Sequence, residues 1–466
     1  MKTNKNLLQV TTIVLVVVLL TTAMFFTFNY SAAKVSSTNL FDSTGSNLDG
    51  ITSEITTPLS YDTRIAKGDS LFEANYFSLA ATEYAFAINI QEENPEAHAK
   101  LGQTYLAQNE DEKAAQNLAR AYQLAPENEE YKTQYALTLL RTSNLEKTTE
   151  ILNESNKEDQ TILFYSGILA TFQHDYKQAE KDFQATQMQS FTDAFSKYSS
   201  QVEGDDVYLR ALLTQSLSDE GEYRLAQNLA TEVLNEKSDY RDVWILLGYA
   251  KLKLEDYQEA EDAFKQAKIL DSVKPETHYF LATAHYMQEE YEEAIAEFEL
   301  ALLYDFEPEE QAYAKLAESQ LFLENYAEAL EAYEYLVKID HESAESFVQP
   351  VWLAIHELKD LDRALTIAQE AQAMFPSESM SHNLTGWVYI ERNELEEAEE
   401  ALETALALDP DLPAAHYNTG LLYEKIGDID AAKEALRDAY DLAGPSQEIG
   451  VMAAERYNAL VIQEAS

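Results

Sequence analysis

The side chains of this chain that could do chemistry are its 8 histidines and 83 acidic residues, because it contains no cysteine. The lack of cysteine removes disulfides, thiolate catalysis and cysteine-ligated zinc sites together. His278 and His285 are separated by two helical turns, which places their imidazoles on one face of a helix. The sequence indicates no third ligand beside them, so the pair alone does not predict a metal site.

The motifs that accompany catalysis are missing as well. The sequence has no G-x-S-x-G turn, no glycine-rich phosphate loop, no H-E-x-x-H pair and no D-x-D-x-D-G calcium loop. Its many carboxylate pairs fall on helix faces that we expect to be exposed to solvent. We therefore predict no catalytic residue, no metal ion and no cofactor, and we expect a protein that is not an enzyme.

The formal net charge of −50 limits the classes of partner. Nucleic acid is bound by clustered lysine and arginine, so we expect no nucleic-acid partner. The body of the protein should also be repelled by anionic lipid. Two explanations of the acidity remain open. In the first, the acidity reflects glutamate, which favours helix and gives a well-solvated helical surface. In the second, an acidic patch recruits a basic partner or calcium.

The elements that position these side chains are helical hairpins, seen most clearly in two copies between Arg241 and Pro308. Apolar residues recur every three or four positions on either side of a short polar break, which is the helical period. A spacing of about 34 residues between equivalent positions is typical of stacked repeats. The first copy contains Trp244, Leu247, Gly248, Tyr257, Ala260, Phe264 and Ala267, and the second contains His278, Leu281, Ala282, Tyr291, Ala294, Phe298 and Ala301.

Small residues at fixed places explain how the two helices of a hairpin meet. Gly248 and Ala260 lie where the helices would cross, and the large Tyr257 and Phe264 fill the space around the crossing. This pattern resembles the tetratricopeptide repeat (TPR), and the resemblance covers nearly all of the chain after Ser60. It implies an all-α fold, a right-handed α-solenoid of helical hairpins.

The resemblance also suggests roles for four histidines. They stand where the family pattern has tryptophan, so we expect them to pack rather than to bind metal; they are His98, His278, His382 and His416.

The repeat pattern divides the chain after Ser60 into four parts. In the third repeat Thr148 replaces the expected small alanine, and in the ninth Pro350 falls inside the first helix, which it should kink or shorten. The parts are an N-terminal array (61–186), an irregular or extended helical insert (187–206), a C-terminal array (207–446), and a capping helix with a tail (447–466).

The N-terminal residues predict attachment to a membrane. Leu7–Phe28 is free of charge and long enough to cross the hydrocarbon core, and Lys2 and Lys5 before it favour a cytoplasmic N-terminus for residues 1–6. We expect a signal anchor, a flexible extracytoplasmic stalk over residues 29–60, and a single-pass protein of the cell membrane with its repeats outside the cytoplasm. The alternative is a signal peptide cleaved after Ala33, which would release a secreted protein.

The resemblance implies that partners bind in a groove lined by the first helix of each hairpin. Its residues would be aromatic and apolar, as peptide anchors often are, although the tyrosines could instead pack within the array. The lysine and asparagine set with which some TPR domains hold a peptide carboxylate is missing. The expected groove residues are Ile245, Tyr249, Leu252, Tyr279, Thr283, Tyr286, Trp387, Ile390 and Tyr417, continued upstream by Phe164, Ile168 and Thr171.

These observations predict a non-enzymatic scaffold for protein–protein interactions. It would bind polypeptides that carry apolar or aromatic segments with basic flanks, and help to assemble or chaperone complexes of the cell envelope. The alternatives are a structural protein that forms a surface layer or filaments, and an accessory subunit of an envelope enzyme.

Overall fold

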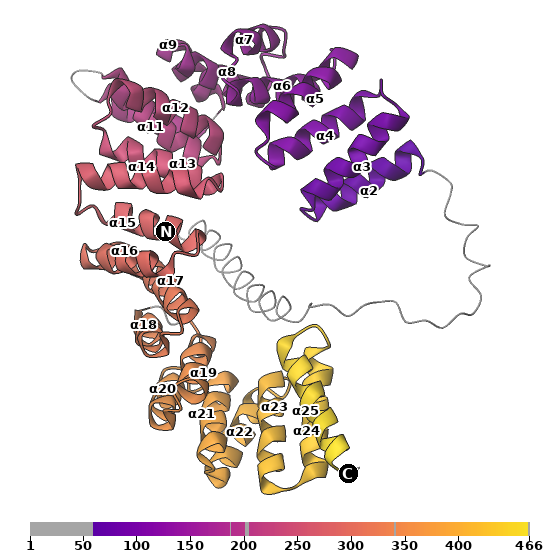
Figure 1. The fold of residues 1–466 in the computed structure, drawn as a ribbon, viewed down its shortest axis with the longest axis vertical. Coiled ribbons are helices and arrows are strands. Elements are labelled where there is room, and N and C mark those ends of the chain that lie inside the picture. Colours follow the sequence, from indigo (N-terminus) through magenta and orange to yellow (C-terminus); the bar gives the residue numbers. More distant parts are fainter. Residues whose placement is uncertain (1–58, 187, 201–204, 340–341, 465–466) are drawn as a thin grey trace. The chain divides into compact units, whose positions relative to one another are not determined.

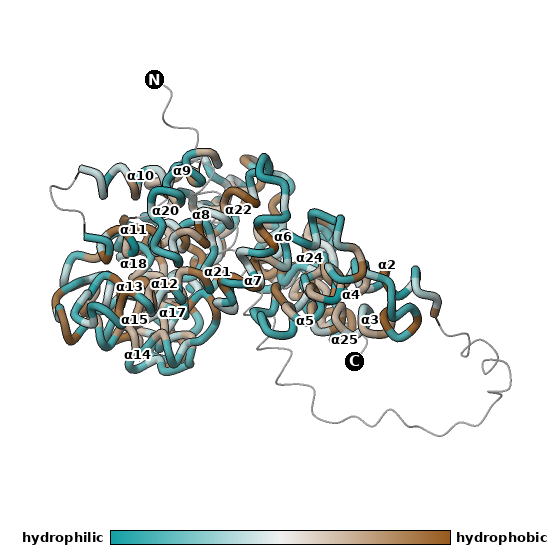
Figure 2. The backbone as a smooth tube through the Cα atoms, turned by 90° about the horizontal axis from the view of Figure 1, so that it is seen from above, coloured by the Kyte–Doolittle hydropathy of each residue, from teal (hydrophilic) through white to brown (hydrophobic). Residues whose placement is uncertain are grey.

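The computed structural model describes residues 59–186, 188–200, 205–339 and 342–464 (Figure 1). All secondary structure in these residues is helical. Apolar and polar segments alternate along the helices in Figure 2, as expected when one face of each helix packs on its neighbours. The predicted all-α solenoid of hairpins is confirmed, whereas its right-handed sense stays a prediction. The predicted spanning segment Leu7–Phe28 lies outside the described residues, and no helix within them is both long and apolar enough to cross a membrane.

The described helices pair into eleven consecutive hairpins, each with a first and a second helix. The first helices are α2 (Tyr61–Glu73), α4 (Pro95–Ala107), α6 (Glu129–Arg141), α8 (Gln160–Phe172), α11 (Asp206–Asp219), α13 (Arg241–Lys253), α15 (Pro275–Met287), α17 (Glu309–Phe322), α19 (Val348–His356), α21 (Ser379–Arg392) and α23 (Pro413–Ile426). The second helices are α3 (Phe77–Ile90), α5 (Asp111–Leu124), α7 (Leu145–Asn153), α9 (Tyr176–Thr186), α12 (Tyr223–Glu236), α14 (Tyr257–Leu270), α16 (Tyr291–Leu303), α18 (Tyr326–Ile339), α20 (Leu361–Met374), α22 (Leu395–Leu408) and α24 (Ile429–Ala443).

Close approach at one crossing holds each hairpin together. A Cβ atom added to Gly248 would lie 2.5 Å from the ring of Phe264, which is on the second helix. Phe264 and Ala260 are fully buried at the same crossing. The same contact, between a glycine and a large residue at the equivalent position of the second helix, recurs in the pairs Gly68–Tyr84, Gly102–Leu118, Gly167–Phe183, Gly386–Leu402 and Gly420–Leu436.

In the fifth hairpin the larger and the smaller side chain at the crossing come from the opposite helices. Thr214 and Ala230 occupy the positions that Gly248 and Phe264 occupy one repeat later, and both are fully buried. The larger side chain is therefore on the first helix and the smaller on the second. Glycine is therefore not required at this crossing in every hairpin, and the seventh hairpin has Ala282 and Phe298 there, both fully buried.

The turn between the two helices is built in the same way in every described hairpin. One residue adopts a left-handed conformation, and the amide after it bonds a carbonyl near the end of the first helix, as Asp256 N does to Lys251 O at 2.9 Å. This is a Schellman-type ending of the first helix. The left-handed residues are Asn75, Asn109, Ser143, His174, Gly221, Glu255, Glu289, Glu324, Lys359, Asn393 and Gly427.

Two irregular places interrupt the array. Helix α10 (Gln189–Ser199) follows the fourth hairpin, and its Phe191 stacks on Phe183 with ring centroids 4.2 Å apart. In the ninth hairpin a 3₁₀ turn, η1 (Ala344–Phe347), precedes an α19 of only 9 residues. Pro350 lies in the first turn of α19, where its missing amide costs no helical bond, so the predicted shortening is confirmed.

A clasp of polar residues joins repeats that are not neighbours. Helix α12 of the fifth hairpin contacts α6 of the third, where Arg141 Nη2 donates to Glu222 Oε2 at 3.2 Å. Asn228 Nδ2 donates to the carbonyl of Arg141 at 2.9 Å, and Arg224 Nε pairs with Asp111 Oδ2 at 3.0 Å. Burial raises the pKa of Asp111 even though Arg141 and Arg224 oppose it. We refer to these five residues as the clasp.

The last helix covers the end of the array. Helix α25 (Glu448–Glu464) packs on α24 and α23, and it buries Ala453 and Leu460 against Leu436 and Ala439 of α24. A solenoid needs such an element because its terminal hairpin otherwise exposes an apolar face.

The crossing can be tested by a double-mutant cycle. Gly248→Ala should lower the free energy of unfolding by about 1–3 kcal/mol, because the new methyl group meets the Phe264 ring. Phe264→Ala should also destabilise the wild type but should recover part of the loss in Gly248→Ala, since it removes the ring that the methyl group meets. Urea unfolding of the four proteins measures the coupling. Strictly additive losses would show that these two positions do not share one space.

Candidate functional site

First helices of neighbouring repeats contact one another in several parts of the described array. Helix α13 contacts α15, α15 contacts α17, and α21 contacts α23 directly. The side chains between these helices are the expected groove residues. Most of them are partly exposed, and the others are buried.

Three tyrosines of this face are packed into the array and only partly exposed. Tyr249 lies edge-on to Phe280 with centroids 5.4 Å apart, and Tyr279 stacks on Phe306 at 4.2 Å. Tyr286 donates from its hydroxyl to Glu318 Oε2 at 2.8 Å. Burial raises the pKa of Tyr249 to about 12, and burial likewise raises the pKa of Tyr279. Each ring is thus held by several neighbours, and each stays partly exposed.

The other expected residues of α13 and α15 sit among these rings. Ile245 and Leu252, like Phe280, pack against the buried residues of α14 and α15, and both stay partly exposed. Thr283 Oγ1 donates to the carbonyl of Tyr279 at 2.8 Å, so its hydroxyl is satisfied within its own helix. This part of the face is apolar, and the ammonium groups of Lys253 and Lys315 lie over the rings of Tyr249 and Tyr286, 5.4 and 4.6 Å from the ring centroids.

A second aromatic group lies on α19 and α21. The His356 ring is between the rings of Trp352, at 5.5 Å, and Trp387, at 5.6 Å. Burial lowers the pKa of His356, which favours the neutral imidazole. Trp387 and, on α23, Tyr417 are partly exposed. Trp352 and His356 were not expected from the repeat pattern, because the irregular ninth hairpin obscures their register.

Four expected groove residues belong to the core instead. Ile390 is fully buried and packs with Leu402 and Leu422, which come from the second helix of its own hairpin and from the next repeat. Phe164, Ile168 and Thr171 are at most 5% exposed. For Phe164 the reason is the additional helix α10, whose Phe191 lies 5.4 Å from it and covers that part of the face. The prediction that these four side chains line an open groove is wrong.

The histidines in the tryptophan position have a shared structural role. Trp244 Nε1 donates to the carbonyl of Ser238, in the loop before its helix, at 2.8 Å. The Nε2 atoms of the histidines make the same contact with the equivalent carbonyl of the preceding loop: His98 with Glu92, His278 with Ser272, His382 with Pro376 and His416 with Pro410, at 2.7–2.9 Å. Imidazole and indole therefore both fasten the loop that enters a first helix, and the predicted packing role is confirmed.

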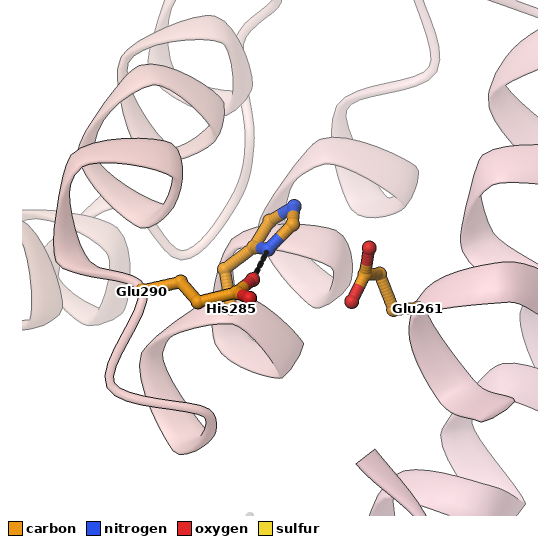
Figure 3. A group of neighbouring side chains, drawn as sticks. All are labelled: Glu261, His285 and Glu290. Atoms are coloured by element: carbon orange, nitrogen blue, oxygen red, sulfur yellow. Dashed lines mark hydrogen bonds and ion pairs between the residues drawn. The ribbon is translucent and has the colours of Figure 1, made fainter. Parts of the chain in front are cut away.

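One cluster of metal-ligating side chains was missed. Glu261 on α14, His285 on α15 and Glu290 before α16 each offer one nitrogen or oxygen atom, and these atoms lie within 4.8 Å of one another (Figure 3). His285 Nδ1 is 2.7 Å from Glu290 Oε2. The helical spacing suggests that His285 and His278 lie on one face of a helix, but Nδ1 of His278 contacts Glu297 rather than His285. Glu261 is hard to find from sequence because it comes from the preceding repeat.

Glu261 and His285 are buried, whereas Glu290 is exposed. Gln258 and Gln288 donate to Glu261 Oε2 at 3.1 and 2.8 Å, and Lys265 pairs with its other oxygen. Burial acts to raise the pKa of Glu261, but the bonds from Lys265 and Gln288 outweigh it and leave the pKa below its usual value. The carboxylate is thus charged and held in place.

Comparison with known families agrees with the hairpin geometry. The tetratricopeptide repeat model matches residues 65–129, 213–275 and 245–314. Related models of the same repeat match residues 386–427 and 413–444. The described stretches between these matches contain hairpins with the same kind of turn. The chain is a tetratricopeptide-repeat protein. No curated protein sequence matches it at a significant level.

Several solved TPR structures are similar to this chain at low identity. Yeast Tom70 is 16% identical, with a TM-score of 0.31, over 87% of this chain and 96% of that one. YrrB, described as a TPR protein with an unusual peptide-binding site, is 18% identical with a TM-score of 0.28, over 48% and 97%. The TPR domain of P58(IPK) is 16% identical with a TM-score of 0.22, over 87% and 99%. Likenesses at this level add nothing to the family assignment.

The contribution of these tyrosines to packing can be tested by a stability measurement. Tyr279→Ala should lower the free energy of unfolding by about 3 kcal/mol, because it removes the ring stacked on Phe306. Tyr440→Ala, at a residue with 36% exposure on α24, is the matched control and should cost less than about 1 kcal/mol. Equal melting curves for Tyr279→Ala and wild type would contradict the packing role.

Proposed function

We propose that this TPR protein is a scaffold anchored in the membrane by Leu7–Phe28, with its repeats outside the cytoplasm. It would bind segments of other polypeptides along the first helices and so help to assemble or chaperone complexes of the cell envelope. A TPR array implies protein–protein interaction as its general role. The location rests on the charge-free segment and on Lys2 and Lys5 before it.

The observation that supports the binding surface best is the partly exposed apolar face of α13 and α15. Tyr249 and Tyr286 are held by neighbours before any partner arrives, so little side-chain entropy is lost on binding. Large rings fixed in this way are typical anchors for an apolar polypeptide segment. Thr283, on the same face of α15, offers a place to disturb the surface without removing a ring.

The charge of the protein suggests what flanks such a segment. Glu318, beside Tyr286, is paired with Lys315, so the attraction would come from the chain as a whole, which has 83 acidic and 33 basic residues. Lysine or arginine next to the bound segment would be attracted over a distance of about 8–10 Å at moderate salt. This attraction mainly raises the association rate, and it falls as salt increases.

Binding on this face can be tested with two substitutions of equal charge. Thr283→Lys should reduce partner capture several-fold, because it puts a long cationic side chain among the rings. Gln266→Lys, on the exposed side of α14, is the control and should leave capture unchanged. Capture is measured by crosslinking in isolated membranes followed by pull-down at low and high salt. Circular dichroism checks that both variants keep their helices. Equal capture by the two variants would rule out this face as the binding surface.

Membrane topology is tested independently of the groove. Protease added to spheroplasts should degrade the repeats while residues 1–6 stay protected, and alkaline carbonate should leave the protein in the membrane fraction. A protein that lacks residues 1–28 should appear in the soluble fraction. Protection of the repeats from protease would place them in the cytoplasm, and release by carbonate would contradict the anchor.

A further inference from the structure

We propose that Glu261, His285 and Glu290 form a binding site for a divalent transition metal ion, of which zinc is the best fit, between the sixth and seventh repeats. One ligand atom from each of the three residues lies within 4.8 Å of the others (Figure 3). The residues come from three different helices or helix starts. The site would therefore fasten a repeat to its neighbour.

The positions of the three side chains follow from the repeat itself. The Schellman-type turn after α15 brings Glu290 back toward the helix end, and Glu290 N bonds His285 O at 2.9 Å. This makes the two side chains neighbours, with 2.7 Å between Nδ1 and Oε2. Glu261 faces this turn from the second helix of the preceding repeat, and Gln288 in the turn donates to it at 2.8 Å.

The cluster has features that separate it from ordinary surface acids. Glu261 and His285 are 5% and 6% exposed, so two of the three ligands have already lost most of their water. Gln258, Gln288 and Lys265 fix the carboxylate of Glu261, as second partners commonly orient ligating carboxylates. Glu290 is exposed, which leaves a route for an ion to enter.

The donor set indicates which ion would bind. One imidazole nitrogen and two carboxylate oxygens suit zinc, cobalt or nickel, whereas calcium and magnesium prefer oxygen ligands alone. Zinc held at about 2.0–2.2 Å by tetrahedral ligands spaces the ligand atoms by about 3.4 Å. His285 and Glu290 need to separate only slightly to reach this spacing. Nδ1 must then be unprotonated, so the proton of the neutral ring resides on Nε2.

Lys265 is the competitor of the metal ion. Its ammonium group pairs with Glu261, and its side chain is about half exposed, so it can move into solvent when a divalent ion arrives. With Lys265 in place the two carboxylates, a neutral imidazole and the ammonium carry a net charge of −1. Removing the ammonium makes that charge −2 and should strengthen metal binding. This gives a variant that is expected to gain affinity.

Zinc titration of the full-length protein by calorimetry, with millimolar magnesium to occupy exposed acids, tests the site. The wild type should bind one zinc ion and melt at a higher temperature with it. His285→Gln and Glu290→Gln should each lose affinity at least tenfold. The matched control is Glu289→Gln, which removes the adjacent exposed carboxylate and should bind as the wild type does. Lys265→Gln should bind several-fold more tightly.

Three results would overturn the proposal. They are the absence of a zinc site stronger than the background of surface acids, a site that persists in both His285→Gln and Glu290→Gln, and a Lys265→Gln protein without a gain in affinity. Circular dichroism shows whether each variant is folded. If His285→Gln fails to fold, Glu290→Gln decides, because Glu290 is exposed and its loss should not disturb the core. None of these outcomes depends on the groove or on the membrane anchor.

Discussion

The close crossing of the two helices in each hairpin is the constraint on which the rest of the structure depends. At Gly248 the backbone of the first helix touches the ring of Phe264, and no larger residue fits without movement. Because the same pair of positions recurs, most of the described hairpins have similar shapes and can stack on the next. The apolar stripe of each helix is then buried between repeats, which a single hairpin could not achieve. The groove face and the tight polar turns are consequences of this stacking.

Much of this fold could be predicted from sequence because the determinants are local and repeated. The crossing residues, the helical period and the polar turns recur at one fixed spacing, so each repeat supports the assignment of the others. The prediction failed where burial depends on a neighbour that breaks the period. Phe164 is covered by α10, which has no counterpart in the other described repeats, and Ile390 is covered from both its own hairpin and the next. The repeat register predicts on which face of a helix a residue lies, but it does not predict how much of that face is covered by a neighbouring helix.

The site residues show the same division between local and non-local information. The structural role of the histidines that replace tryptophan could be predicted from sequence. Their partner is a carbonyl in the loop just before their own helix, as for Trp244. The cluster around His285 was missed because its buried carboxylate, Glu261, belongs to the second helix of the preceding repeat. Its neighbour Gln288 bridges the same gap. A comparison of turn residues with second-helix residues of the preceding repeat would have found both contacts.

The clasp gives this array a property that a simple stack of repeats lacks. In a stack with contacts only between neighbours, tension applied to the ends peels off one repeat after another at similar force. Arg141 and Glu222 are 81 residues apart in the chain, and their contact closes a loop that contains the fourth hairpin and α10. Force transmitted along the chain therefore bypasses that loop until the clasp ruptures. The segment between the second and fifth hairpins should act as one mechanical unit, and the extra length stored in it would be released in a single step.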